Sequence, residues 1–177
     1  RYFLVAKEVG NLTRIFAAAI EDSQETPRNR VRYGIAREKI GMFPVEGGRL
    51  ALPNRRHFED HPRDLINMFA IAQAQNIDLH PRTLWVMTQN IARVDNDLRE
   101  DRQANDLFME ILTSRHDPAR ALRSMNEAGV MGRFLPDFGR VVAQMQHDMY
   151  HVYTVDEHSI LAIGVLSGIE RGELADE

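Results

Sequence analysis

The sequence predicts a mainly α-helical protein, a helical bundle with one small β-hairpin near residues 42–53. Three observations favour this fold class. Apolar residues recur every three or four positions along most of the chain, which is the period of a helix with one buried face. Proline stands where several of these patterns begin, as it does in the first turn of many helices. One stretch has the signature of a hairpin, with apolar residues on both sides of a Gly-Gly pair.

The first expected helix runs from Tyr2 to about Ile20, because its apolar residues have helical spacing. A polar stretch that contains Pro27 follows and is interpreted as a loop. The hairpin is placed around the turn of residues 46–49, since its two central glycines tolerate the positive φ that tight hairpin turns need. The basic residues 55–57 just beyond it are interpreted as a solvated loop.

Two helices are expected after the hairpin, each beginning near a proline. The first begins at Pro62, and its buried stripe consists of Leu65, Ile66, Phe69 and Ala70. The second begins at Pro81 and continues to Leu98, because apolar residues alternate by three and four over this range. We expect these two helices to pack together.

Three more helices complete the expected bundle. A short helix carries Leu107, Phe108, Ile111 and Leu112. Pro118 opens the next helix, with Asp117 as its N-terminal cap and Gly129 as the residue that closes it. Pro136 begins the third.

The composition of the chain argues against several classes of function. The chain has 177 residues, a net charge of −4 and a pI of about 6.0, so it lacks the basic excess that nucleic acid or an anionic membrane attracts. It contains no cysteine, which excludes disulfides, thiolate metal sites and cysteine nucleophiles and fits a cytoplasmic protein. No apolar run approaches the roughly 20 residues that cross a membrane. Both ends look like cuts from a longer polypeptide.

The stretch QHDMYHVYTVDEH, residues 146–158, concentrates histidines and carboxylates. His147 and His151 have the spacing of the two histidines on a zinc-protease helix, which suggests a small autonomous metallohydrolase. Three points weigh against it. Asp148 is shorter than the glutamate that serves as general base in those enzymes, and the helix is expected to end near His151. A third ligand would have to come from Glu170 or Glu173, near the end of the chain. Surface histidines at a helix end are the alternative.

His158 is the stronger candidate. Thr154 and Glu157 have the spacing of a capping box, so a last helix is expected to begin there. At about 100° per residue, His158 lies on the same side as Val155, Ala162, Val165 and Ile169. We therefore expect His158 to point inward and Asp156 to face away. A core imidazole with a local hydrogen-bond partner and a metal ligand both fit this position.

Three segments of the chain resemble a known family. VGNLTR (residues 9–14), SMNEAGVMGR (residues 124–133) and FLPDFGRVVAQMQHDMYHVYTVDEH (residues 134–158) are similar to the bifunctional PII uridylyltransferase/uridylyl-removing enzymes, which are bacterial nitrogen sensors. The resemblance covers nearly the whole chain. Members of this family have a nucleotidyltransferase domain, a helical linker, a metal-dependent HD domain and two glutamine-sensing domains.

The resemblance implies an organisation for this chain. Residues 1–57 would be the helix and hairpin that follow the nucleotidyltransferase domain, residues 58–150 the helical linker bundle, and residues 151–177 the first helix of a truncated HD domain. The Gly-Ser pair of the nucleotidyltransferase signature is absent, since no glycine here is followed by serine. UMP transfer is therefore not expected from these residues alone.

The resemblance also implies a site. His158 matches the first metal ligand of the HD domain, and the remaining ligands would follow the end of the present sequence. The intact enzyme would use Mg²⁺ or Mn²⁺ and would act with the PII signal protein, UTP and glutamine as partners. This chain alone is expected to bind no cofactor, to be inactive, and to associate with itself through faces that other domains normally cover. A plain helical interaction module without catalytic activity is the other alternative, beside the metallohydrolase.

Overall fold

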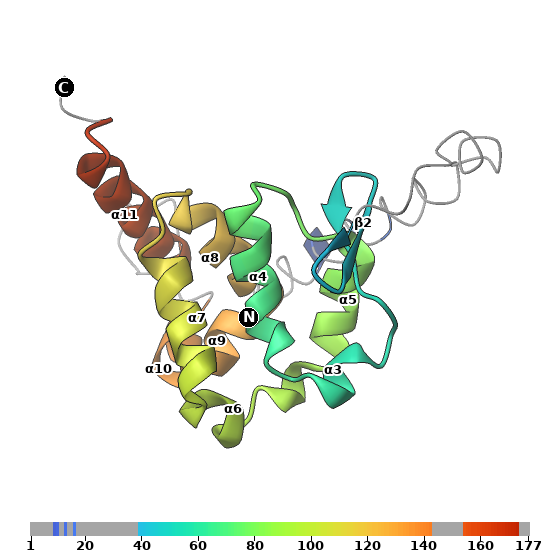
Figure 1. Ribbon diagram of the computed structural model, residues 1–177. Helices are drawn as coiled ribbons and strands as arrows, with labels where there is room; N and C mark the ends of the chain where they lie inside the picture. The colour runs from blue at the N-terminus through green and yellow to red at the C-terminus, as the bar shows by residue number, and fades with distance from the viewer. Residues whose placement is uncertain (1–8, 11–12, 14–15, 17–38, 143–153, 174–177) are drawn as a thin grey trace.

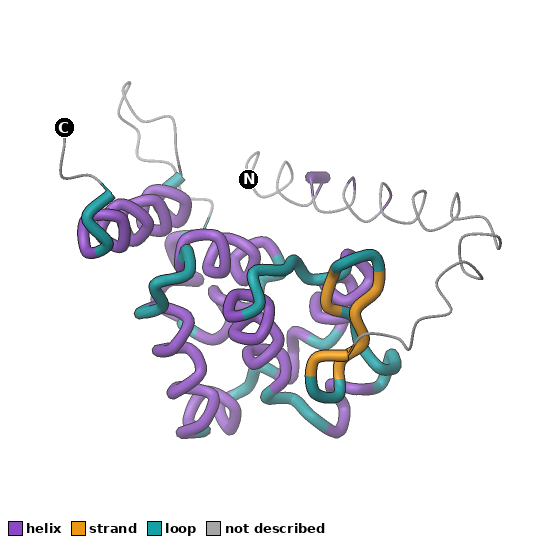
Figure 2. Tube along the Cα trace, turned by 45° about the horizontal axis from the view of Figure 1, so that its top comes forward, coloured by secondary structure: helices purple, strands orange, loops and turns teal. Residues whose placement is uncertain are grey.

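The computed structural model describes residues 9–10, 13, 16, 39–142 and 154–173. This part of the chain is mainly α-helical and carries one small antiparallel sheet, which confirms the expected fold class (Figure 1 and Figure 2). Of the first expected helix, Val9, Gly10, Thr13 and Phe16 are described, and all four are helical. The hydroxyl of Thr13 donates a hydrogen bond to the Val9 carbonyl at 2.8 Å. The rest of that helix lies outside the described residues.

The sheet has three short strands, β1 (Lys39–Ile40), β2 (Phe43–Glu46) and β3 (Arg49–Leu50), in the order β1-β2-β3. The pairing of β2 with β3 confirms the expected hairpin. Its two turn glycines have φ of +56° and +74°, a conformation that costs other residues free energy. Strand β1 was not expected, because two residues are too few to show an alternating pattern.

The hairpin is joined to the helices through its last strand. The Leu50 amide donates to the Asp78 carbonyl at 2.8 Å, and the His80 amide donates to the Leu50 carbonyl at 2.8 Å. His80 also caps helix α5 (Pro81–Gln89), since its Nδ1 accepts from the Arg82 amide at 3.2 Å. Strand β3 is therefore bonded to the residues that begin α5.

The bundle consists of short helices around one core. They are α3 (His57–Asp60), α4 (Asp64–Ala74), α5, the 3₁₀ turn η1 (Ile91–Arg93), α6 (Asn96–Glu100), α7 (Arg102–Leu112), α8 (Pro118–Glu127), α9 (Val130–Phe134) and α10 (Pro136–Val141). Helix α4 is central and packs on α7 and α8 (Figure 1). The expected α4 stripe is buried, which confirms that the apolar period identifies the inner face of this helix.

The expected helix from Pro81 to Leu98 is wrong, because the chain breaks twice in this range. The Asn90 side chain donates to the Val86 carbonyl at 2.9 Å, and the Asp95 carboxylate accepts from the Leu98 amide at 3.1 Å. Such local bonds compete with the backbone hydrogen bonds of a continuous helix, so α5, η1 and α6 replace one long helix. Helix α4 packs mainly on α7 and α8, and the buried residues Val86 and Met87 of α5 belong to the same hydrophobic core.

Helix boundaries with strong local signals are confirmed. Helix α8 begins at Pro118, its Asp117 cap accepts from the Arg120 amide at 3.1 Å, and Gly129 follows its end with φ of +76°. Helix α10 begins at Pro136. Pro62, by contrast, lies in a turn, and α4 begins two residues later.

Helix α11 (Val155–Glu170) packs on α8, at the side of the bundle that is opposite to the sheet (Figure 1 and Figure 2). It is the longest helix in the described part of the chain. Among the described residues, no helix combines the length and the apolar character that a membrane crossing requires.

Candidate functional site

Helix α11 begins where the sequence predicts, but the predicted capping box is not formed. Thr154 occupies the N-cap position without a side-chain cap hydrogen bond. Glu157 instead accepts from the Arg123 guanidinium of α8, with 3.3 Å between Nε and Oε2. The glutamate thus holds α11 to its neighbour rather than closing its own first turn.

A buried hydrogen bond joins the same two helices. The Nδ2 atom of Asn126 donates to Oδ2 of Asp156 at 2.8 Å, and the two residues are only 2% and 1% exposed. The Oδ1 atom of Asn126 is also buried, and no described residue donates to it. Burying a carboxylate is costly unless it is hydrogen-bonded, so this bond constrains how α11 sits on α8.

The rest of the interface between α8 and α11 is equally close. A Cβ atom placed on Gly164 would lie 3.0 Å from the Cβ of Ala119, so the two helices approach more closely here than two side chains normally allow. Near the end of α11, the Arg171 guanidinium donates to the Ser167 hydroxyl at 2.6 Å and to the Arg115 carbonyl at 3.4 Å. Contacts along the whole helix therefore define its position.

The expected orientation of His158 is wrong. Asp156, which was expected to face away, is buried, whereas His158 is exposed on the opposite side of α11. The outer stripe also contains Leu161, Ala162, Val165, Leu166 and Ile169, all of them exposed. Because α11 is apolar on both sides, the apolar period does not select the buried side. The buried side is the one that carries Asp156, which is bonded to Asn126, and Gly164, which lies next to Ala119.

The structure does not bring the sequence-predicted site residues together. His158 stands on the outer face of α11, and His147 and His151 lie outside the described residues. Within the described residues, no three side chains from histidine, aspartate or glutamate form a group that would hold a metal ion. An exposed imidazole nitrogen can coordinate a divalent cation, so His158 fits the role of one metal ligand in a larger set.

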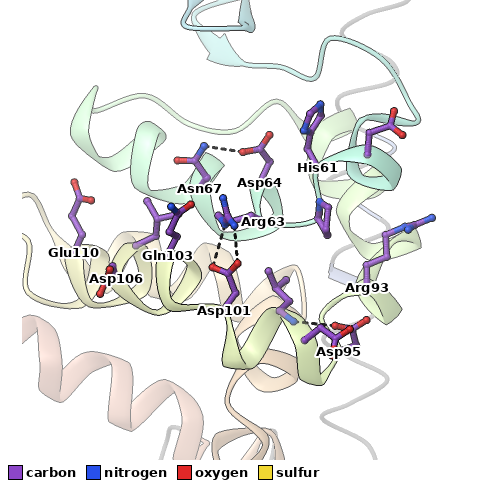
Figure 3. A pocket seen from close by; sticks show the side chains of 15 residues that line it. His61, Arg63, Asp64, Asn67, Arg93, Asp95, Asp101, Gln103, Asp106 and Glu110 are labelled. Carbon is purple, nitrogen blue, oxygen red and sulfur yellow. Dashed lines mark hydrogen bonds and ion pairs between the residues drawn. The ribbon is translucent and has the colours of Figure 1, made fainter.

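A second feature is a hollow of about 830 Å³ between the start of α4 and helices α6 and α7 (Figure 3). Carboxylates dominate its lining: Asp60, Asp64, Asp95, Asp97, Asp101, Asp106 and Glu110. Two arginines, Arg63 and Arg93, line it as well. No sequence motif marks it, because its walls come from separate segments of the chain.

An ion pair crosses this hollow. The Arg63 guanidinium contacts the Asp101 carboxylate through two bonds, Nε to Oδ1 at 3.2 Å and Nη2 to Oδ2 at 2.7 Å (Figure 3). Asp101 also caps α7 by accepting from the Ala104 amide at 2.8 Å. The hydrogen bond from Arg63, followed by that from the Ala104 amide, lowers the pKa of the Asp101 carboxyl below its usual value. The pair fixes the start of α4 against the start of α7.

The interpretation of residues 55–57 as a solvated loop is wrong for one of them. Arg55 and Arg56 are exposed, but His57 is buried and only 3% exposed. Its Nε2 atom lies 2.6 Å from Oδ2 of Asp64, and the Phe43 ring packs edge-on against it at 5.4 Å. His57 therefore connects the hairpin, α3 and α4, which gives it a structural position in the bundle.

These features define a mainly helical domain whose last helix presents an exposed histidine and an uncovered apolar stripe. Residues 43–134 match the model of the uridylyltransferase GlnD third domain. The chain belongs to this family, which confirms the resemblance seen in the sequence.

The similarity to whole proteins extends beyond residues 43–134 to almost the entire chain. The bifunctional uridylyltransferase/uridylyl-removing enzyme of Azospirillum brasilense is 56% identical, over 99% of this chain and 19% of its own length. The enzymes of that name from Rhodospirillum rubrum and Novosphingobium aromaticivorans are 52% and 48% identical, over 99% and 97% of this chain and 19% of their own lengths. The chain thus spans about a fifth of the length of these relatives. No solved structure matches it.

Proposed function

We propose that this chain is the central helical region of a bifunctional PII uridylyltransferase/uridylyl-removing enzyme of bacterial nitrogen regulation. The whole enzyme would transfer UMP from UTP to PII and hydrolyse PII-UMP in the cytoplasm, under the control of glutamine. The observation that carries the proposal is the family match over residues 43–134, together with the relatives that match almost the entire chain.

The proposed role of this region is to hold two catalytic domains in a fixed relation. Residues 1–57 would follow the nucleotidyltransferase domain, residues 58–150 would form the connector, and residues 151–177 would begin the HD domain. Two features of the structure support this role. The connector has a continuous buried core, and α11 is fixed to α8 by polar contacts and by close helix packing.

His158 is the residue we propose as a metal ligand in the whole enzyme. Its exposed position on α11 supports this role, since an imidazole buried against α8 would be closed to other ligands. A bound Mg²⁺ or Mn²⁺ would stabilise the negative charge on the phosphoryl oxygens during hydrolysis. The other ligands are proposed to come from residues that follow this sequence in the family pattern, so the chain alone would be inactive.

The uncovered stripe of α11 is consistent with this arrangement. Leu161, Val165, Leu166 and Ile169 are large apolar residues, and Leu166 is 65% exposed. A contiguous exposed apolar patch of this kind usually marks an interface. We propose that the remainder of the HD domain covers it in the whole enzyme.

The test of the proposed function uses the full-length enzyme with His158→Ala. We expect loss of metal-dependent uridylyl removal with UMP transfer retained, because the two reactions use different domains. His116→Ala is the matched control, since His116 is also an exposed histidine and has no proposed role. Loss of both reactions in His158→Ala, or of neither, would contradict the assignment.

A second experiment addresses the chain by itself. Incubation with uridylylated PII and Mn²⁺ or Mg²⁺ is expected to release no UMP. Metal-dependent release that tracks the purified chain would favour the autonomous metallohydrolase. In that case bound metal would be lost in His151→Ala and retained in His158→Ala.

A further inference from the structure

Helix α11 is apolar on both of its long faces, so burial of apolar surface does not determine which face packs on α8. Ile160 and Ile163 contact the core, whereas Val165 and Leu166 are exposed. Successive residues of a helix are about 100° apart, so a rotation by one position would exchange parts of these two faces. Another interaction must select the observed face.

The Asn126 to Asp156 hydrogen bond has the properties of that interaction. It is directional, both side chains are almost fully buried, and they belong to different helices. A rotation of α11 that moved Asp156 away from Asn126 would leave the Asn126 amide buried without this partner. Buried polar pairs of this kind are known to fix the register of packed helices, at a cost in stability.

The Asn126 side chain shows that cost. Its Oδ1 atom is buried and accepts no hydrogen bond from the described residues. An aliphatic side chain of similar size would leave no such acceptor unsatisfied. An interface optimised for stability alone would not require an amide here, whereas an interface that must select one face would.

We propose that Asn126 is a positioning residue, whose hydrogen bond to Asp156 selects the face of α11 that packs on α8 and so places His158 on the outer face. The structural part of this proposal stands on the geometry of α8 and α11. Its consequence for catalysis rests on the proposed function of His158 as a metal ligand. The two parts are separated by two measurements.

The first measurement follows the exposure of two adjacent positions on α11. Leu166 is 65% exposed and Ser167 is 9% exposed. The chain has no native cysteine, so Leu166→Cys or Ser167→Cys introduces a single thiol. With Asn126 and Asp156 in place, we expect a thiol-reactive dye to label Leu166→Cys at least about tenfold faster than Ser167→Cys, because the buried position reacts only when α11 leaves its docked state.

The same two thiols are then placed in the Asn126→Leu/Asp156→Leu background. This double variant removes both buried polar groups, so the chain is expected to stay folded by circular dichroism. We expect the labelling ratio to fall several-fold, as α11 samples more than one rotation. Asn105→Leu is the control, because Asn105 is an exposed asparagine on α7, and it is expected to leave the ratio unchanged.

A conservative variant distinguishes face selection from simple packing. Asn126→Asp/Asp156→Asn exchanges the two groups and retains an amide-to-carboxylate bond between the helices. We expect it to restore the labelling ratio of the unmodified chain. If the leucine pair keeps that ratio, Asn126 does not select the face, and the positioning proposal is overturned.

The second measurement is Mn²⁺ binding by the full-length enzyme. With the leucine pair we expect binding to weaken about tenfold or more, a loss typical of changes in the residues that orient metal ligands. A reduced labelling ratio with unchanged Mn²⁺ affinity would support the positioning role of Asn126 and contradict the ligand role of His158. Weakened affinity with an unchanged labelling ratio would overturn the positioning role.

Discussion

A methyl group on Gly164 would lie 3.0 Å from the Cβ of Ala119, closer than two such carbons normally approach. The two residues face each other across the interface between α8 and α11. Helix α11 sits as close to the connector as it does because position 164 carries no side chain. The buried hydrogen bond between Asn126 and Asp156 joins the same two helices at another point of the interface.

Gly164→Ala is therefore expected to weaken the docking of α11. Overpacking typically costs about 1–3 kcal/mol, which outweighs the gain of up to about 1 kcal/mol from the better helix propensity of alanine. Ala119→Gly/Gly164→Ala moves the methyl group from one helix to the other and is expected to recover most of the packing loss. Urea unfolding followed by circular dichroism measures both. A single variant as stable as the unmodified chain would show that the interface adjusts without cost.

Asp64→Ala is expected to destabilise the start of α4. The Asp64 carboxylate lies 2.6 Å from Nε2 of the buried His57, and it accepts a hydrogen bond from the side-chain Nδ2 of Asn67 at 2.8 Å. Leaving a buried imidazole without its partner costs about 1–3 kcal/mol. Asp60→Ala is the control, because Asp60 is exposed, and it should change the free energy of unfolding by less than about 0.5 kcal/mol. Equal effects of the two variants in urea denaturation would contradict this role of Asp64.

The ion pair of Arg63 with Asp101 predicts a pH dependence of stability. Its hydrogen bond lowers the pKa of Asp101 below the usual 3.8, so the folded protein binds a proton at this carboxyl less readily than the unfolded chain does. The contribution to stability is fully present above that usual value and is lost as the pH falls through the lower, folded value.

The measurement compares urea midpoints of the unmodified chain and Asp101→Asn. We expect the unmodified chain to be more stable at about pH 6 and the difference to shrink below about pH 3.8, as the carboxyl becomes neutral like the amide. Glu110→Gln changes another carboxylate that lines the same hollow and is expected to leave the midpoint at pH 6 unchanged. A difference that persists undiminished in acid would show that the pair stabilises the fold by means other than charge.

Self-association is expected to depend on the outer stripe of α11. Leu166→Glu/Ile169→Glu places two charges on this stripe, where both side chains are exposed, so the fold should be retained. Light scattering should show association for the unmodified chain at high concentration and a monomer for this variant. Met109→Glu changes an exposed apolar residue on α7 and is expected to leave association unchanged. A monomeric unmodified chain would remove the basis of this prediction.

Elements with strong local signals could be predicted from the sequence. The cap at Asp117, the proline after it and Gly129 together determine α8, and the glycine pair determines the hairpin turn. These signals act over a few residues and do not depend on the rest of the fold. The same holds for the start of α11 after Thr154, although the glutamate expected to complete its cap pairs with Arg123 instead.

Features that depend on distant residues could not be predicted. The inner face of α11 is selected by Asn126, which lies 30 positions before Asp156, and a helix with two apolar faces gives no local indication of the choice. The acidic hollow is formed by separate segments, and the pair of Arg63 with Asp101 spans 38 positions. The helical pattern and the family resemblance both identified His158 as a candidate, but its outward orientation required the structure.

The bonds between strand β3 and the residues before α5 have a consequence for how the protein opens. Leu50 both donates to and accepts from this segment, and His80 in turn caps α5. The hairpin and the first turn of α5 should therefore exchange their amide hydrogens with solvent as one cooperative unit, with similar protection factors. A destabilising substitution in the small sheet should therefore speed amide exchange in the first turn of α5, some thirty residues further along the chain.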